Sequence, residues 1–458
     1  MHHRTMTAFR YPLLVFYVLA LFACNRSGQV ESRELTFNDS IAPIIFRNCS
    51  PCHRPGSAAP FSLLSYEDVK RHARTIQLTV SNRSMPPWPA DPEYTHFREE
   101  KWLSDREIEA INAWIGADMP EGDPNHPPSA PAFTEGSAYG KPDLVVSMRA
   151  PFPLPGDNKD RFMMMKIPIE LPQDTFVRAI EIVPGNRKLA HHINGHLIVY
   201  QAGKKRDIQG GKEYVDTEIM DKHSAYQALD LPNDDGSYPL LIPSVTNYLP
   251  GVEPVLYPED IGGYQLRKKT ILLLDNIHYG PSPVDTSDLS HFNLFFAPRP
   301  SKRPTRDFIL GTSGISPIIP PLVIPPDSVT RHTTRYTLPE KISLLSVNPH
   351  MHLLGKSFKA YALTPSGDTL RIISIPRWDF RWQYVYTFRK PLVIPAGSTL
   401  VAEGEFDNTE NNPLNPFHPP QTVSERDGSM RTTDEMFQLI GTFLHYEPGD
   451  ENRDLSKQ

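Results

Sequence analysis

The N-terminal part of the chain carries apolar residues at helical spacing. Residues 65–81 carry apolar residues at mixed helical spacing. Ser104–Glu107 forms a capping box, in which the serine oxygen accepts a backbone N–H and the glutamate reaches back to the start of the helix. Isoleucines within Ile108–Ile115 then mark one helix face. We therefore expect an all-α domain over residues 24–124.

Beyond Pro142 the apolar residues occur in short runs between clusters of turn residues. The runs lie at residues 163–171, 176–183, 197–200, 271–278 and 292–297 in one group, and at 342–347, 357–363, 384–388 and 436–444 in another. Many short strands separated by turns are typical of antiparallel sandwiches. We expect two all-β, jelly-roll-like sandwich domains, one over residues 145–300 and one over 327–450.

Proline and charge refine this organisation. The 48 prolines are roughly twice the usual share of about 5%, and proline avoids helix interiors and β-ladders. Two proline-rich stretches, residues 125–144 and 301–326, are expected to be linkers, and residues 451–458 a polar tail. The net charge of −6, without a long basic run, argues against nucleic acid as a partner.

The first residues resemble an export signal. Arg4 and Arg10 precede an apolar run, Tyr11–Ala23, which has the length of a signal-peptide core and is too short to span a bilayer comfortably. The run ends at Cys24, as in a bacterial lipoprotein cleavage site. We expect residues 1–23 to be removed and Cys24 to carry a lipid on a membrane surface. The protein would then be exported, as a periplasmic or outer-membrane-anchored bacterial lipoprotein; the alternative is an ordinary signal peptide with an incidental cysteine.

A C-x-x-C-H motif follows at Cys49, Cys52 and His53. This motif is the attachment signature of c-type haem: the thiols bond to the haem and the histidine becomes an axial ligand of the iron. A zinc site would need a second pair of ligands at similar spacing, and no cysteine remains for one. A thioredoxin-like motif would need a βαβ pattern, which is absent. The sequence thus predicts one covalent haem c.

The sixth haem ligand has two candidates. Residues 30–124 resemble a small class I cytochrome c over most of that length. In that family the ligand methionine usually precedes the last helix, which favours Met85 over Met119. Either methionine could instead fill a gap in the core.

A second group of potential ligands lies in the β region. Its members are His191, His192, His278, His350, His352 and Met436. Residues i and i+2 of a strand share a face, so His350 and His352 can reach one metal. His191 and His192 would point to opposite faces unless a bulge or bend intervenes. The thioether of Met436 is a soft ligand that selects Cu(I), so the set favours copper.

Four short motifs in this region resemble one known family. They are Leu189–His192, Ile277–Gly280, His350–Lys356 and Thr433–Met436. In this order they are similar to motifs of the copper type II, ascorbate-dependent monooxygenases, the family of peptidylglycine α-hydroxylating monooxygenase and dopamine β-monooxygenase. The similarity covers roughly residues 145–446.

The resemblance implies two copper ions that face each other across an open cleft between two β-sandwiches. The first copper would be held by His191, His192 and His278. The second would be held by His350, His352 and Met436, where O₂ and substrate react. There are departures from the family. This region has no cysteine, whereas the animal enzymes are rich in disulfides, and residues 203–250 match no motif and are expected to be an inserted loop.

The predicted function is that of an exported copper-dependent monooxygenase that hydroxylates a C–H bond of a small-molecule or peptide substrate with O₂. The fused haem domain would supply the electrons, which come from an external donor, either ascorbate or a redox protein. One alternative is a non-catalytic periplasmic electron-transfer or copper-binding lipoprotein. Another is a cytochrome joined to a copper-free sandwich that binds carbohydrate or protein.

Overall fold

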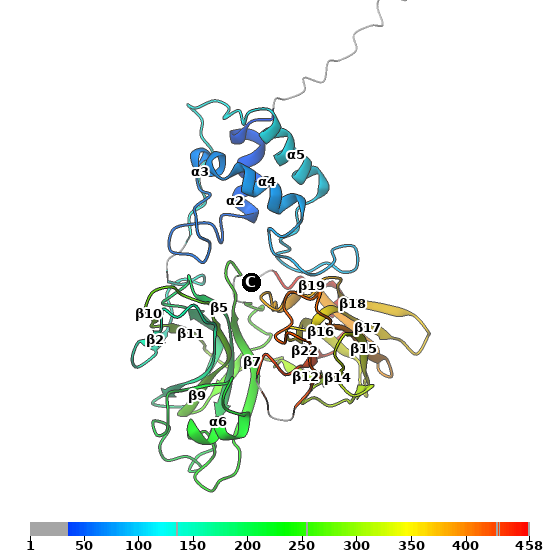
Figure 1. The fold of residues 1–458 in the computed structure, drawn as a ribbon. Coiled ribbons are helices and arrows are strands. Elements are labelled where there is room, and N and C mark those ends of the chain that lie inside the picture. Colours follow the sequence, from blue (N-terminus) through cyan, green and yellow to red (C-terminus); the bar gives the residue numbers. More distant parts are fainter. Residues whose placement is uncertain (1–34, 134–135, 253–254, 427–428, 430, 457–458) are drawn as a thin grey trace, which may run out of the picture.

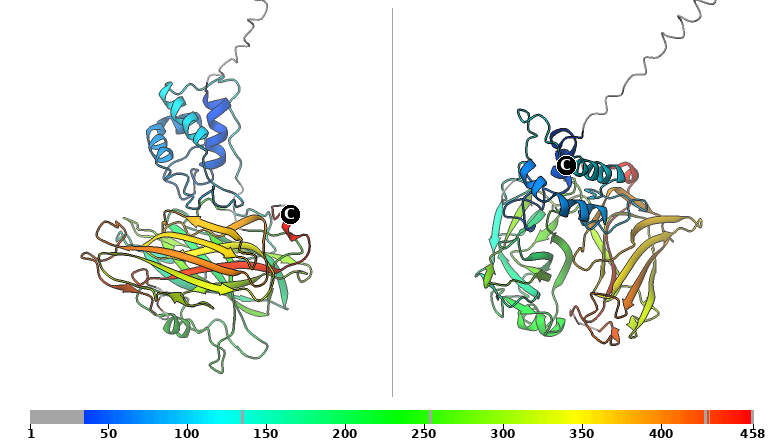
Figure 2. Two further views of the ribbon diagram at one scale, coloured as in Figure 1. Left: turned by 90° about the vertical axis from the view of Figure 1, so that its right-hand side faces the viewer. Right: turned by 45° about the horizontal axis from the view of Figure 1, so that its top comes forward.

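The structure, a computed structural model, describes residues 35–456 apart from 134–135, 253–254, 427–428 and 430. The predicted signal peptide and Cys24 lie outside the described residues. The described part forms a helical region that sits above two bodies of β-structure (Figures 1 and 2). Among the described helices, none has the length and apolar character needed to cross a membrane.

The helical region packs around its own small core. Its elements are η1 (Phe37–Ile41), α2 (Ala42–Asn48), α3 (Tyr66–Arg71), α4 (Ala73–Ser81) and α5 (Asp105–Gly116). Phe37 and Trp114 are among the buried side chains at the centre of this core. The capping box predicted at the start of α5 is present, with both reciprocal hydrogen bonds. The helical spacing noted over residues 65–81 corresponds to two helices, because His72 leaves helical geometry and separates α3 from α4.

The first β body is a two-layered sandwich. One layer has the strand order β1-β11-β4-β8 and the other β6-β3-β9-β5-β7, and the recorded strand pairs are antiparallel. The strands are β1 (Leu144–Ser147), β3 (Arg161–Glu170), β4 (Thr175–Val183), β5 (Ala190–Val199), β6 (Tyr214–Asp216), β7 (Leu240–Tyr248), β8 (Tyr264–Leu266), β9 (Lys269–Tyr279) and β11 (His291–Ala297). A separate ribbon pairs β2 (Phe152–Leu154) with β10 (Thr286–Asp288). Aliphatic side chains from both layers, such as Ile180 and Leu272, form the core.

The second β body has the same two-layered plan. Its layers have the orders β12-β22-β16-β19 and β13-β15-β20-β17-β18. The strands are β12 (Arg306–Gly311), β13 (Ile318–Ile319), β15 (Ser328–Thr337), β16 (Ile342–Met351), β17 (Gly355–Leu363), β18 (Thr369–Ile375), β19 (Tyr386–Ile394), β20 (Thr399–Asn408) and β22 (Phe437–His445). A short ribbon of β14 (Val323–Ile324) and β21 (Val423–Ser424) lies beside them. The expectation of antiparallel sandwich structure is confirmed.

Two stretches expected to be irregular contain regular structure. Residues 203–250 hold β6, the helix α6 (Lys222–Ala228) and β7, which forms one edge of a sheet. The expected linker at 301–326 contains β12, which pairs with β22. Both expectations were therefore wrong in part. Short apolar runs among prolines and polar residues concealed these strands, since tertiary pairing rather than local pattern stabilises them.

The helical region is fixed to the second sandwich by the segment that follows α4. Trp88 is buried against Tyr384 and Tyr386, with ring centroids 5.3 Å from each. Phe97 forms a β-bridge with Phe388, and its ring lies 5.2 Å from that residue's ring. These side chains belong to the same apolar core as the strands of the second sandwich. The segment is thus an integral part of that core.

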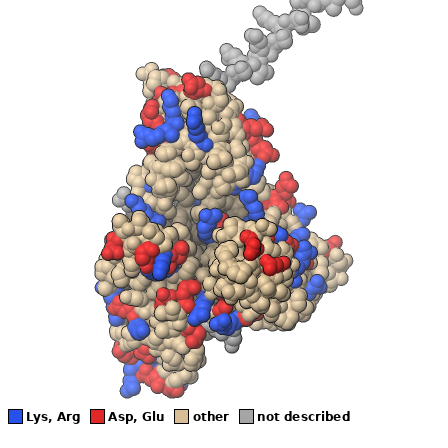
Figure 3. Space-filling view, viewed as in Figure 1, with Lys and Arg blue, Asp and Glu red and all other residues tan. Residues whose placement is uncertain are grey.

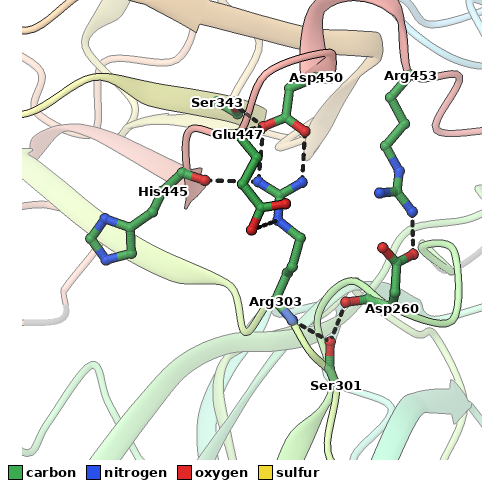
Figure 4. Close-up of polar contacts among 8 residues, drawn as sticks. All are labelled: Asp260, Ser301, Arg303, Ser343, His445, Glu447, Asp450 and Arg453. Atoms are coloured by element: carbon green, nitrogen blue, oxygen red, sulfur yellow. Dashed lines mark hydrogen bonds and ion pairs between the residues drawn. The ribbon is translucent and has the colours of Figure 1, made fainter.

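The chain between the sandwiches is tied to the C-terminal end of the last one (Figure 4). Arg303 donates two hydrogen bonds to the carboxylate of Asp450, at 2.6 and 2.8 Å, and a third to the carbonyl of His445. Both charged side chains are buried. Ser343 also donates to Asp450. Nearby, Arg453 pairs with Asp260.

We expect Asp450→Asn to lower the free energy of unfolding by about 3 kcal/mol at pH 7, because Arg303 would keep a buried charge without a counter-ion. Burial raises the pKa of Asp450, but hydrogen bonds from Arg303 and Ser343 outweigh this effect and hold the pKa at about 2. Because the pKa of this carboxyl is lower in the folded than in the unfolded protein, its ionised form stabilises the fold at pH values above the unfolded-state pKa of 3.8. This stabilisation is lost as the pH falls through the folded-state pKa. Urea denaturation of protein and variant between pH 7 and 2 measures both effects.

The matched control is Glu447→Gln, which removes an exposed carboxylate that pairs with the guanidinium of Arg303. Exposed pairs contribute little, so this variant should change stability by less than about 1 kcal/mol. The stabilising role of the Arg303–Asp450 pair would be contradicted if both variants lost the same free energy of unfolding. It would also be contradicted if the loss in Asp450→Asn stayed constant down to pH 2.

Candidate functional site

The C-x-x-C-H motif lines a cavity of about 380 Å³ between the helical region and the two sandwiches. Cys49 directly follows the last residue of α2, and Cys52 and His53 lie in the turn beyond it. Both cysteines are free thiols. Burial raises the pKa of Cys49 to about 12 and also raises that of Cys52, so both are protonated at neutral pH. The space-filling view is hollowed where the helical region meets the sandwiches, and on the face shown charges of both signs are interspersed (Figure 3).

His53 is held in a geometry that suits a metal ligand. Its Nδ1 lies 3.2 Å from the carbonyl oxygen of Phe61, to which it can donate. Such a bond fixes the tautomer and leaves Nε2 to bind a metal. Burial lowers the pKa of His53, which favours the neutral ring that ligation requires.

The two candidate methionines lie in different places. Met85 lines the same cavity as Cys49, Cys52 and His53. Met119 instead packs against the core of the helical region, and its carbonyl accepts a hydrogen bond from Tyr66. The structure therefore brings Met85, and not Met119, to the cavity.

Three histidines converge at one end of the first sandwich. His191 and His192 lie on β5, and the register between β5 and β9 shifts on both sides of His192. These irregularities let neighbouring residues turn toward the same site, as joint ligation requires. The ring of His278, on β9, lies 4.5 Å from that of His191 and 5.2 Å from that of His192, centroid to centroid.

The ring of His191 packs closely against the backbone of Gly280. Gly280 lies two residues after His278. A Cβ on residue 280 would lie 2.6 Å from Nε2 of His191. A residue larger than glycine would therefore displace that ring. This contact gives a physical reason for glycine in the His-Tyr-Gly motif.

The nitrogen atoms of this cluster fit a metal. Nδ1 of each histidine is buried and has no hydrogen-bond partner. Burial lowers the pKa of His191 to about 4 and that of His192 well below its ordinary value, so both rings are neutral at pH 7. Buried polar atoms without partners are costly. Three inward-facing imidazoles with such atoms are suited to bind a metal ion.

Asp160 belongs to this cluster, although it stands in none of the sequence motifs. Nε2 of His278 donates to its carboxylate at 2.6 Å. This hydrogen bond lowers the pKa of Asp160 and leaves Nδ1 of His278 as the ligand atom. A carboxylate that holds a ligand histidine in this way is common around metals. Potential ligand atoms of Asp160, His191 and His278 all lie within 4.8 Å of one another.

The second cluster lies where β16 ends and β22 begins. Met351 is paired with Phe437, and both side chains are fully buried in the core. Alternation along a strand places the residues on either side of this pair on the opposite face. His350 therefore lies on the opposite face, and its imidazole centroid is 5.1 Å from that of His352. Met436 immediately precedes Phe437, at the start of β22.

The histidines of this cluster are held through Nδ1. Nδ1 of His350 lies 2.6 Å from Oε1 of Gln383, and Nδ1 of His352 lies 2.8 Å from the carbonyl of Asp434. Their Nε2 atoms remain for a metal. Burial lowers the pKa of His350 to about 3 and that of His352 to about 4.

Glu435 connects the segment after β16, which carries His352, to the residue before β22, Met436. Its carboxylate is buried and accepts backbone N–H groups of Leu354 at 2.7 Å, His352 at 2.9 Å and Met436 at 3.2 Å. Burial raises its pKa to about 8, against the lowering effect of these donors. Glu435 lies within the Thr433–Met436 motif, but the motif alone did not show that its carboxylate connects the segment of His352 to that of Met436.

A phenylalanine lies between the two histidine clusters. The ring of Phe380 is 6.1 Å from that of His192 and 5.7 Å from that of His352, centroid to centroid, and its side chain is buried. The open cleft expected between the clusters is thus occupied, at this point, by a side chain of the second sandwich.

Comparisons with known proteins add no assignment. No protein-family model matches the sequence, and no curated protein matches it. A solved structure of PNGF-II aligns with 66% of this chain and 66% of its own, at 9% identity and a TM-score of 0.22. A structure of infectious bursal disease virus, Gt strain, aligns with 70% of this chain and 77% of its own, at 10% identity and a TM-score of 0.16. Likeness this weak supports no inference about function.

Proposed function

We propose that the protein is a copper-dependent monooxygenase that receives electrons through its own c-type haem. The convergence of five histidines, far apart in sequence, into two separate clusters carries this proposal, and Met436 lies in the chain directly before β22, which pairs with the strand of His350. A His-His-His set beside a His-His-Met set suits copper, since the thioether prefers Cu(I). When bound, copper supplies the activation of O₂ for attack on a C–H bond, and haem supplies one-electron transfer.

The chain's own residues bind and orient these groups. His191, His192 and His278 would hold one copper, and Asp160 keeps the last of them in the correct tautomer. The second copper would be held by His350, His352 and Met436. Glu435 and Gln383 orient the two histidines of this set. The two imidazoles of that set are almost fully buried, which keeps bulk water away.

The haem would occupy the cavity at the foot of the helical region. Cys49 and Cys52 would carry it covalently, and His53 and Met85 would bind its iron. All four residues line this cavity. The external electron donor would be ascorbate or a redox protein.

The proposed setting is outside the bacterial cytoplasm. A signal peptide over residues 1–23 and a lipid on Cys24 would place the protein in the periplasm or at the outer membrane. The substrate would be a small molecule or a peptide. A non-catalytic electron-transfer or copper-binding lipoprotein is the second candidate, favoured by the buried position of Phe380 between the clusters.

The test is metal analysis followed by O₂ uptake. We expect about two copper ions and one iron per chain, because each cluster supplies three soft or borderline ligands. Reduced protein should then consume O₂ with a candidate substrate and release a hydroxylated product. A copper content near zero would contradict both candidates. Full metal content without product, across small-molecule and peptide substrates, would favour the non-catalytic lipoprotein.

A further inference from the structure

One short segment of the second sandwich contacts the haem cavity and both histidine clusters. It comprises Asp379–Tyr384, in the connection between β18 and β19. The two clusters and the cavity are built from strands and helices that are distant in sequence. Their meeting at one connection suggests that the connection couples them.

On the cavity side the segment supplies aromatic and charged groups. Arg381, Trp382 and Tyr384 line the cavity that holds the C-x-x-C-H motif. The rings of Trp382 and Tyr384 are stacked, with centroids 6.3 Å apart and an interplanar angle of 20°. The hydroxyl of Tyr384 donates to the carbonyl of Pro87, two residues after Met85, at 2.7 Å. His191 lines the same cavity, so the cavity and the three-histidine cluster share a wall.

On the other side Phe380 joins the clusters by direct packing. Its ring lies 6.1 Å from His192, 6.5 Å from His278 and 5.7 Å from His352, measured between centroids. The side chain is only 3% exposed, so protein rather than solvent fills this part of the gap.

Gln383 adds a hydrogen-bonded connection. Its Oε1 accepts from Nδ1 of His350 at 2.6 Å and from Nδ2 of Asn276 at 3.5 Å. Asn276 lies on β9, two residues before His278, so this amide links the strand of one cluster to a ligand of the other. The Nε2 group of Gln383 donates to the carbonyl of Phe380 at 3.0 Å, which fixes the amide orientation.

We propose that residues 379–384 conduct electrons between the two copper sites, through Phe380 and Gln383, after they leave the haem. This inference rests on the proposed function. Each transfer would move one electron: a haem held by Cys49, Cys52 and His53 would give it up, a copper ion held at the three-histidine site would accept it, and the second site would then receive it from there. No bond forms or breaks and no proton moves. Two transfers, with the haem reduced each time by an external one-electron donor, supply the two electrons that hydroxylation consumes.

The experiment compares Phe380→Leu and Gln383→Leu with Arg377→Gln. Arg377 is an exposed residue of the same connection, outside all three sites. Copper-loaded, oxidised, O₂-free full-length protein receives one electron from a light pulse. Haem absorbance then follows the first transfer, and freeze-quenched paramagnetic resonance of the two cupric sites follows the second.

We expect both leucine variants to slow the second transfer by roughly tenfold or more and to leave the first unchanged, while Arg377→Gln changes neither. Circular dichroism and metal content are measured first, and a variant that retains fold and metals is sufficient for the test. Unchanged second-transfer rates in metal-loaded variants would overturn this inference alone. Missing haem or copper in the parent protein would overturn the proposed function and this inference with it.

Discussion

Met436→Ala is expected to abolish hydroxylation while the three-histidine site keeps its copper. The variant removes the proposed soft ligand of the second site and leaves the histidines of β5 and β9 untouched. Removing a side chain that only hydrogen-bonds to a metal ligand typically lowers metal affinity or activity by about 10–100-fold. Removing a ligand itself should therefore lower turnover by more than about 100-fold. Product formation and copper per chain, measured on the same samples, test this expectation.

The matched variant is Met436→Leu, which keeps a similar volume and removes only the sulfur. It should lose turnover to the same degree and retain stability. If turnover survived in the leucine variant, the assignment of the second site would be wrong. If both variants lost all copper, the two sites would not be independent.

Replacing Cys49 and Cys52 together with alanine is expected to remove covalent haem completely. In the proposed site each thiol would form one of the bonds to the haem, and a haem held without them would dissociate when the protein is denatured. A denaturing gel stained for haem peroxidase activity gives the result directly. Met119→Leu is the control, because that side chain packs in the core of the helical region and should leave the stain intact. A stained double variant would exclude this attachment site.

The features that sequence predicts best are those whose parts lie close together in the chain. The capping box of α5 needs only Ser104 and Glu107, three residues apart, and it is present. Strands such as β4 and β11 were found because most of their residues are apolar and follow one another closely in the chain. In contrast, β15 is largely polar, and its pairing with β20 stabilises it, so the apolar pattern did not predict it.

The candidate sites show the same division. The ligand residues could be selected because they stand in short motifs. The bulges that turn His191 and His192 toward one point could be named as a requirement but not located, since they depend on pairing with β9. Asp160 and Gln383 were missed because each contacts a histidine that is distant in sequence: His278 lies 118 residues from Asp160, and His350 lies 33 from Gln383. Such contacts depend on the tertiary fold.

The anchoring of Trp88 and Phe97 in the second sandwich has a consequence for dissecting the protein. A fragment that begins after residue 124 would lack both rings and would open a gap in an apolar core beside Tyr386 and Phe388. An isolated helical fragment would in turn expose two large aromatic side chains to water. Expression of either half alone should therefore expose apolar surface and yield material that aggregates more readily than the whole chain.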